Sequence, residues 1–167
     1  CCHYESLIGK MLLVGNEDGV LEELHLPGET RTFAIPKEWQ EDPRCLSEVL
    51  LQLNEYFAGA RQEFALELAP QGTPFQQRVW QELCAIPFGA TASYGAIAQR
   101  IGKPKACRAV GMANSRNPIP IIIPCHRVIG KDGSLTGFSG GLDVKQQLLG
   151  LERRVMAAYT GKGIRFV

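Results

Sequence analysis

The chain has 167 residues, of which 45% are hydrophobic, 21% are charged and 8% are aromatic, and its formal net charge is +1. This is the composition of a globular protein with a real core, so it excludes disordered, collagen-like and coiled-coil proteins. The longest apolar stretch, residues 119–123, is far shorter than the ~20 residues of a membrane span. With no basic-then-apolar leader at the start, we expect a cytoplasmic, nucleoid-associated protein that makes no membrane contact.

The two halves of the chain carry opposite charge. Residues 1–71 hold five basic and thirteen acidic side chains, whereas residues 72–155 hold eleven basic and four acidic ones. The first half is therefore strongly acidic and the second strongly basic, which favours a polyanionic partner for the second half. The alternative is a chance segregation of solvated charge.

The first 71 residues are predicted to form a small sheet domain with one helix. Strand-like segments at 11–14 and 20–26 are separated by a turn, and alternation at 64–68 predicts a further strand. Between them, apolar side chains recur at helical spacing from Leu46 to Phe57. Pro70-Gln71-Gly72 is the expected domain boundary.

Residues 72–167 are predicted to form a mostly helical domain. Thr73 can cap a helix that begins at Pro74. A short helix from Tyr94 to Ile101 and another from Lys105 to about Ser115 are joined by a tight turn at Gly102, which matches a helix-turn-helix unit. A last helix is expected from about Asp143 to Val155.

The helix expected at residues 105–115 has a basic surface on which small side chains surround an arginine. On a helical wheel Arg108 lies opposite the apolar face, and the small residues Cys107 and Gly111 flank it. Residues 100–116 hold five basic side chains and no acidic one, which favours phosphate contacts. The alternative is an ordinary solvated helix face. The residues that we expect to pack inward are Ala106, Ala109, Val110 and Ala113.

Six cysteines lie at positions 1, 2, 45, 84, 107 and 125, without a CxxC pair. A zinc site or a disulfide framework is therefore not expected, and most of these cysteines are predicted to act as small hydrophobes. The segment Cys1-Cys2-His3 is predicted to belong to an N-terminal strand rather than to a metal site.

Cys125 is the candidate reactive cysteine, and a buried structural thiol is the alternative. It follows the segment 121–123, which we predict to be buried and extended, and Pro124, which forces a turn. His126 is adjacent in sequence, so a contact through a bridging water is easier than a direct bond. Glu152 is a candidate to orient the imidazole; the alternative is an exposed acid paired with Arg153 or Arg154.

The segment Pro124-Cys125-His126-Arg127-Val128 resembles the active-site motif of the O6-alkylguanine-DNA alkyltransferases, which are single-turnover DNA repair proteins, also called methylated-DNA–protein-cysteine methyltransferases. Further motifs follow in family order over residues 72–153: Thr73-Pro74-Phe75-Gln76 with Trp80, Pro87-Phe88-Gly89, Ser93-Tyr94, Arg108-Ala109-Val110-Gly111, Asn117-Pro118, Gly137-Phe138-Ser139-Gly140-Gly141, Lys145, Leu148-Leu149 and Glu152.

The resemblance implies an α+β fold and a reaction. The fold is an N-terminal ribonuclease-H-like sheet domain (1–71) followed by a helical, winged-helix-like domain (72–167). The reaction is irreversible alkyl transfer from O6-alkylguanine, and also from O4-alkylthymine, to the protein's own cysteine after nucleotide flipping. No cofactor is implied, and the expected partner is double-stranded DNA bound by a monomer through the minor groove.

The resemblance also assigns roles to residues of this chain. Cys125 accepts the alkyl group, and His126 (through a water) with Glu152 keeps it as a thiolate. Arg108 takes the place of the flipped nucleotide, and Tyr94 contacts its phosphate and its guanine ring. The expected substrate pocket comprises Asn117, Pro120, Val128, Phe138, Ser139 and Gly140. Further expected DNA contacts are Gln76, Gly95, Lys103, Ala109, Gly111 and Lys131.

Three departures from the family pattern accompany these matches. Phe138 stands where many relatives have Tyr, and Cys107 replaces a usual Ala on the groove-facing helix. The N-terminal zinc ligands of some relatives have no clear counterpart, so no metal is carried over.

Two other functions remain as alternatives: a transcription regulator with an incidental cysteine, and a cysteine hydrolase, for which no Gly-rich elbow is evident.

Overall fold

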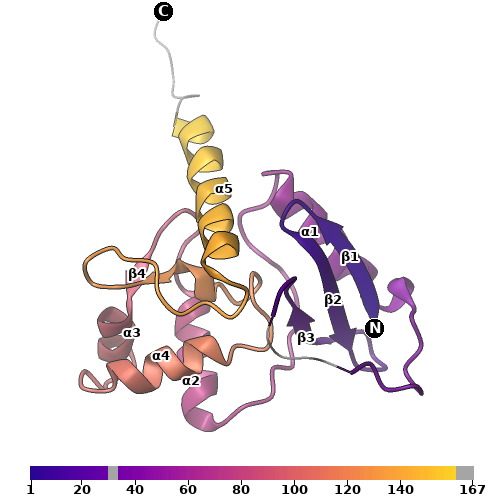
Figure 1. Ribbon diagram of the computed structural model, residues 1–167, viewed down its shortest axis with the longest axis horizontal. Helices are drawn as coiled ribbons and strands as arrows, with labels where there is room; N and C mark the ends of the chain where they lie inside the picture. Colours follow the sequence, from indigo (N-terminus) through magenta and orange to yellow (C-terminus); the bar gives the residue numbers. More distant parts are fainter. Residues whose placement is uncertain (30–33, 161–167) are drawn as a thin grey trace, which may run out of the picture.

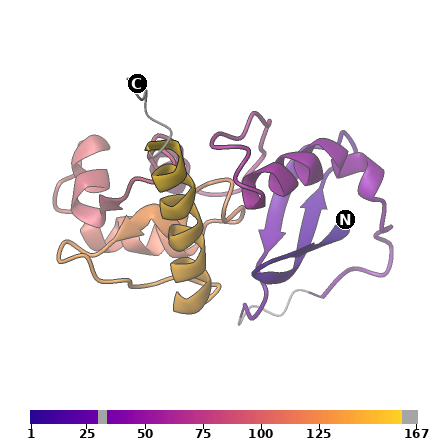
Figure 2. The ribbon, with the colours of Figure 1, turned by 90° about the horizontal axis from the view of Figure 1, so that it is seen from above.

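The computed structural model describes residues 1–29 and 34–160, so that the last seven residues of the expected second domain lie outside the described part. The chain folds into an N-terminal sheet domain and a mostly helical C-terminal domain that lie side by side (Figures 1 and 2). The predicted α+β class is thereby confirmed. In the described residues, no helix is both long and apolar enough to cross a membrane.

A three-stranded antiparallel sheet forms the N-terminal domain. Its strands are β1 (Cys2–Ser6), β2 (Gly9–Gly15) and β3 (Leu21–His25), in the order β1-β2-β3. Cys2 pairs with Leu13 and lies on the buried face, as expected for an N-terminal strand. Met11 and Leu13 of β2 point into the core with the period of a half-buried strand, and a register shift between Val14 and Gly15 interrupts this alternation.

One helix covers this sheet. A 3-10 turn, η1 (Pro43–Leu46), leads into α1 (Ser47–Phe57), as the helical spacing predicted. The strand expected at residues 64–68 does not form and leaves only an isolated bridge from Leu68 to Leu21. The Gln52 side chain supplies the reason, because its amide accepts a hydrogen bond from Ala65 N (2.8 Å) and donates one to Ala65 O (3.1 Å). The Gln52 side chain thus makes the backbone hydrogen bonds that a neighbouring strand would otherwise make.

The C-terminal domain begins with three helices. These are α2 (Pro74–Cys84), α3 (Tyr94–Arg100) and α4 (Cys107–Ser115). Thr73 caps α2, as predicted, and Gln76 completes a capping box with it, while Ser93 caps α3. α4 begins two residues later than expected, and it packs against both α2 and α3.

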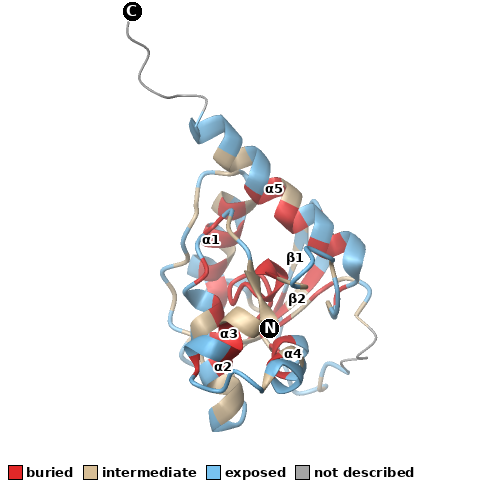
Figure 3. Ribbon diagram, turned by 90° about the vertical axis from the view of Figure 1, so that its left-hand side faces the viewer, coloured by how far each residue is buried: buried red, intermediate tan, exposed pale blue. Residues whose placement is uncertain are grey.

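A long helix completes the fold. The short strands β4 (Ala92–Ser93) and β5 (Val128–Ile129) pair in parallel, and a 3-10 turn, η2 (Cys125–Arg127), directly precedes β5. α5 (Leu142–Thr160) extends beyond the predicted 143–155 and carries one buried stripe between exposed faces (Figure 3). It lies on the side of its domain that faces α1 (Figure 2).

The two domains contact each other next to the chain segment that carries Cys125. Leu24 N of β3 donates to Pro118 O (2.8 Å), and a Cβ added at Gly140 would strike Leu26. A Cβ added at Gly59, just after α1, would lie 2.9 Å from Val155 of α5. The sheet domain is therefore packed directly against the segments that hold the candidate site.

Candidate active site

A tight turn, rather than the expected extended segment, presents Cys125. Ile121 adopts a left-handed conformation with φ 75°, and Ile123 N donates to Ile119 O (2.9 Å). The Asn117 side chain bridges the turn: its Oδ1 accepts from Ile119 N (3.0 Å) and its Nδ2 donates to Ile123 O (2.8 Å). This amide, together with full burial of the Ile121 side chain, fixes a backbone conformation that is rare for β-branched residues.

Cys125 is held at the N-terminus of η2 and is only 3% exposed. Its backbone N donates to Ile123 O (2.8 Å), and its carbonyl accepts from Asn114 Nδ2 (3.4 Å). Burial raises the pKa of the Cys125 thiol to about 11, although a hydrogen bond with Asn117 and the charge of Lys145 pull it down. Burial by itself therefore favours the protonated thiol, so the thiolate that the resemblance implies depends on a neighbouring group that takes up the proton.

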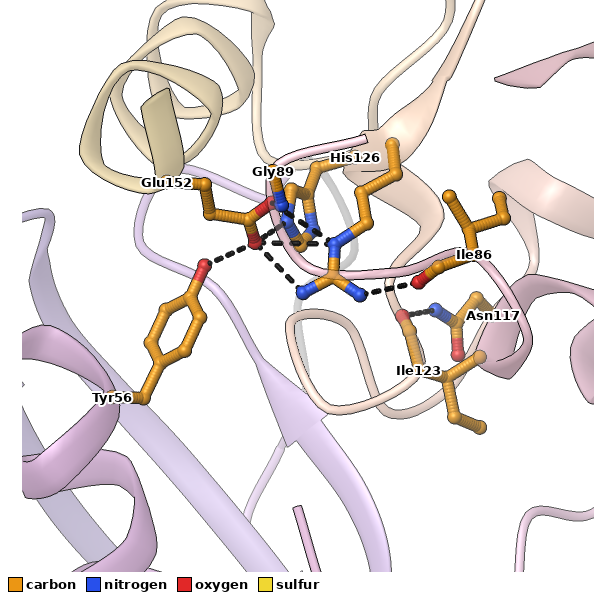
Figure 4. A network of polar contacts seen from close by, with 8 residues as sticks. Tyr56, Ile86, Gly89, Asn117, Ile123, His126 and Glu152 are labelled. Atoms are coloured by element: carbon orange, nitrogen blue, oxygen red, sulfur yellow. Dashed lines mark hydrogen bonds and ion pairs between the residues drawn. The ribbon is translucent and has the colours of Figure 1, made fainter. Parts of the chain in front are cut away.

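His126 and Glu152 meet directly, although 26 residues separate them. The distance from His126 Nε2 to Glu152 Oε1 is 2.7 Å, and both side chains are fully buried (Figure 4). Burial lowers the pKa of His126, so the imidazole is neutral at neutral pH. A carboxylate can only accept, which places the proton on Nε2 and leaves Nδ1 as an acceptor. Nδ1 is buried, and no partner for it is found within the described residues.

Glu152 is the centre of a buried network and not an exposed acid, so the alternative pairing with Arg153 or Arg154 is wrong. Arg127 donates from Nε to both carboxylate oxygens (3.2 and 3.0 Å) and from Nη2 to Oε1 (2.9 Å). Gly89 N donates to Oε2 (3.1 Å). Burial alone would raise the pKa of Glu152, but the hydrogen bonds and charges of His126 and Arg127 hold it at about 2.

Two side chains of this network were not predicted as site residues. Arg127 lies inside the recognised motif without an assigned role, and its Nη1 also donates to Ile86 O (2.7 Å). Tyr56 belongs to α1 of the other domain, and its hydroxyl donates to Glu152 Oε1 (2.8 Å) (Figure 4). No sequence signal links Tyr56 to residue 152, because its helical spacing identifies it only as a core position.

This arrangement can carry a proton away from a thiol. A neutral imidazole with a free Nδ1 can accept a proton, through a bridging water, from a sulfur one residue away. Glu152 then stabilises the imidazolium through Nε2. Cys125, His126 and Glu152 thus have the chemistry of an activated nucleophile, with each side chain held by buried partners.

Tyr94 and Lys145 hold the loop that follows η2. The Tyr94 hydroxyl donates to Thr136 O (3.1 Å), and Lys145 Nζ donates to Val128 O (2.6 Å) and to Thr136 O (3.0 Å). The predicted pocket residues gather around this loop and the turn before Cys125. Asn117, Pro120, Val128 and Gly140 are buried, Phe138 is partly buried, and Ser139 is exposed.

A groove of about 800 Å³ runs between the two domains beside this loop. Asn117, Ser139 and Gln76 line it from the helical domain, while Glu22 and Glu29 line it from the sheet domain. Two of the predicted pocket residues, Asn117 and Ser139, therefore lie at a domain boundary, where ligand sites are common.

The candidate DNA surface is centred on α4. Arg108 and Cys107 are exposed, while Val110 and Ala113 are buried as predicted. Ala109 is exposed, so the expectation that it packs inward is wrong. The helix buries Asn114 instead, whose amide donates to the Cys125 carbonyl. The face of α4 that carries Ala109 is consequently available to a partner.

The remaining predicted contacts lie around this surface. Lys103 is exposed, with its Nζ 5.5 Å from the Phe75 ring centroid, and Lys131 is exposed on the loop after β5. The Gln76 side chain is engaged in the α2 capping box. Gly95 and Gly111 are half-buried on α3 and α4, beside Cys107 and Tyr94 respectively.

Most of the cysteines lie outside the core. Cys45, Cys84 and Cys107 are exposed, and only Cys2 and Cys125 are buried. Across residues 1–29 and 34–160, no group of three or more His, Cys, Asp or Glu side chains could hold a metal ion.

Comparison with known proteins identifies relatives over nearly the whole chain. The family model described as "6-O-methylguanine DNA methyltransferase, DNA binding domain" matches residues 74–154, and the one described as its "ribonuclease-like domain" matches residues 1–70. A "Methylated-DNA--protein-cysteine methyltransferase" of Methanosarcina barkeri is 55% identical over 148 residues, which cover 89% of this chain and 93% of the relative. The crystal structure of Mycobacterium tuberculosis OGT in complex with DNA shares 49% identity and covers 92% of each chain with a TM-score of 0.85.

Proposed function

Because the chain belongs to the 6-O-methylguanine DNA methyltransferase family, we propose that it repairs DNA by transferring the alkyl group of O6-alkylguanine to Cys125. Transfer occurs once per molecule and is irreversible, because a thioether is a poor leaving group. O4-alkylthymine, which carries its alkyl group on an equivalent oxygen, is a second substrate. The observation that carries the proposal is a buried cysteine that adjoins a buried His126–Glu152 pair.

The reaction balances as a nucleophilic displacement. The Cys125 sulfur forms a bond to the alkyl carbon as the bond from that carbon to O6 breaks, and the electron pair of the broken bond stays on the base. The thiol proton passes through a water to His126 Nδ1, and the base takes up one proton and leaves as ordinary guanine. Because burial favours the thiol form of Cys125, the reaction needs a base that takes up this proton, and His126 is the base beside it.

The substrate nucleotide must leave the duplex to reach the sulfur. Cys125 is almost completely buried, and an O6 substituent inside the base stack cannot approach it. We assign α4 to the minor groove, where its small residues let the backbone come close and Arg108 fills the gap left by the nucleotide. Tyr94 then contacts the flipped guanine, and the remaining predicted basic residues contact phosphates. The protein acts as a monomer.

A pair of cysteine variants tests the assignment of the acceptor. After incubation with a duplex that contains O6-methylguanine, peptide mass mapping should place one methyl group on the peptide that contains Cys125. Cys125→Ser should remain unmodified, whereas Cys84→Ser should react like the wild type, because Cys84 is an exposed thiol outside the network. Methylation of Cys125→Ser, or of a peptide that lacks residue 125, would remove Cys125 from the reaction.

A further inference from the structure

Tyr56 belongs to the N-terminal domain and reaches the proton relay of the C-terminal domain, by which we mean Cys125, His126 and Glu152. It lies in α1, its side chain is fully buried, and its hydroxyl donates to Glu152 Oε1 (2.8 Å) across 96 residues of sequence. This is the same oxygen that accepts from His126 Nε2 (2.7 Å). Tyr56 and His126 therefore donate hydrogen bonds to the same carboxylate oxygen, so each weakens the other's bond (Figure 4).

The Tyr56 hydroxyl is a permanent donor at this site. Three rings hold the side chain in place, with centroid distances of 5.2 Å to Phe57, 5.4 Å to Phe64 and 6.0 Å to Phe88. Burial, together with the nearby charge of Glu152, raises the pKa of Tyr56 well above its ordinary value. The phenol consequently stays protonated at every pH at which the protein works, and it can donate to Glu152 but cannot take a proton from the relay.

The charged groups around the relay pull in opposite directions. Glu152 favours the imidazolium form of His126, while the cations Arg127 and Lys145 disfavour it. A donor on the carboxylate spreads its negative charge and so weakens its attraction for the imidazole proton. Tyr56 and Arg127 both donate to Oε1, so both reduce the basicity that Glu152 confers on His126.

We propose that Tyr56 is a positioning residue by which the N-terminal domain weakens the Glu152–His126 pair and so sets how readily His126 takes up the Cys125 proton. The inference rests on the proposed function, in which the Cys125 thiol is used once.

Tyr56→Phe tests this role, because it removes the hydroxyl and keeps the ring packing. In the DNA-free protein, NMR titration of the His126 imidazole nitrogens should show a pKa higher by about half a unit or more. In single-turnover reaction with O6-benzylguanine, the rise of the rate with pH that follows loss of the His126 proton should move to higher pH by the same amount. If the hydrogen bond from Tyr56 to Glu152 is only structural, neither the His126 pKa nor the pH profile of the rate should shift.

Tyr4→Phe is the matched control. Tyr4 lies in the same domain and donates to Asn54 of the same helix, α1, at 2.8 Å, away from the relay. Its substitution should leave the His126 pKa unchanged. If Tyr56→Phe melts at a much lower temperature, 3-fluorotyrosine at position 56 replaces it; this more acidic donor should lower the His126 pKa.

The inference and the proposed function can fail separately. A His126 pKa that is equal in the wild type and Tyr56→Phe, or lower in Tyr56→Phe, overturns the role of Tyr56, whatever the activity of the protein. Failure of the wild type to transfer a methyl group from DNA to Cys125 overturns the proposed function, even if the NMR shift is observed.

Discussion

Arg108 is an exposed cation near the start of α4, on the surface assigned to DNA. We expect Arg108→Ala to slow repair of O6-methylguanine in a duplex by about ten-fold or more, because nucleotide flipping costs a few kcal/mol that the side chain offsets. Reaction with free O6-benzylguanine, which needs no flipping, should be nearly unchanged. Single-turnover rates on both substrates provide the measurement, and equal losses would contradict the role in flipping.

His126 and Glu152 should behave as one unit. We expect Glu152→Gln and His126→Ala each to slow alkyl transfer at neutral pH, and the double variant to be little slower than the slower single variant. The deficit should shrink as the pH approaches about 11, the pKa of Cys125, where the thiolate forms without help. The measurement is single-turnover rate against pH, with thermal melting to establish that each variant is folded.

Glu152→Gln needs that folding control because it leaves the buried Arg127 guanidinium without its carboxylate, at a cost of about 3–5 kcal/mol. A folded Glu152→Gln variant with a constant rate deficit up to high pH would assign Glu152 a structural role alone.

The individual site residues differ in how far the sequence identifies them. Cys125 and His126 stand in a recognisable motif, and Glu152 lies at its expected place on the last helix. Arg127 and Tyr56 complete the network through contacts to Glu152 over 25 and 96 residues, respectively. Local periodicity marks Tyr56 as a buried helix position, but it carries no information about which residue of another domain its hydroxyl meets.

On helix α4, close approach to DNA and stability of the helix favour different residues at position 111. Gly111 lies within it, and an added Cβ would come no nearer than 3.8 Å to Tyr94, which is ordinary contact. We expect Gly111→Ala to raise the free energy of unfolding by about 0.5–1 kcal/mol, because Ala has the higher helix propensity. The same methyl group should weaken duplex binding by holding the helix backbone away from the groove.

Thermal melting and a DNA-binding titration at fixed salt give both quantities. Gly111→Ala with unchanged DNA affinity would exclude Gly111 from the interface, whatever its effect on the melting temperature.

The helices were predicted better than the extended segments. Capping residues and apolar spacing act locally, so α2, α3 and α5 appear where the sequence placed them, with ends shifted by a few residues. The extended structure predicted for segments 64–68 and 121–123 does not form, for one shared reason. In each, a side chain amide from elsewhere, Gln52 or Asn117, takes up backbone groups that a strand would pair, and hydrophobic alternation does not reveal such a partner.

Glu152 is a buried carboxylate that links the two domains, because it accepts from Tyr56 of the N-terminal domain and from Arg127 of the C-terminal domain. The pKa of Glu152 is about 2, below its ordinary value near 4.5, so its contribution is complete above pH 4.5 and is lost as the pH falls toward 2. His126 acts in the same direction: burial lowers its pKa, so acid also favours the unfolded state below about 6.5.

We therefore expect the free energy of unfolding of the wild type to fall, on acidification, by up to about 3 kcal/mol more than that of Glu152→Gln. Denaturant titrations of both proteins at several pH values between about 5 and about 2 measure this difference, since the other carboxyl groups are shared. Parallel pH curves would contradict the assignment of a strongly stabilised carboxylate to Glu152.

The most direct test of the account is the stoichiometry of methyl transfer. A fixed amount of the intact protein is incubated with increasing amounts of a duplex that contains O6-methylguanine, and both intact protein mass and restored guanine are measured. The account predicts one methyl group per protein, a plateau at one equivalent of restored guanine, and no reaction for Cys125→Ser. Restoration of several guanines by each protein molecule, or none by the wild type, would contradict single-use transfer to Cys125.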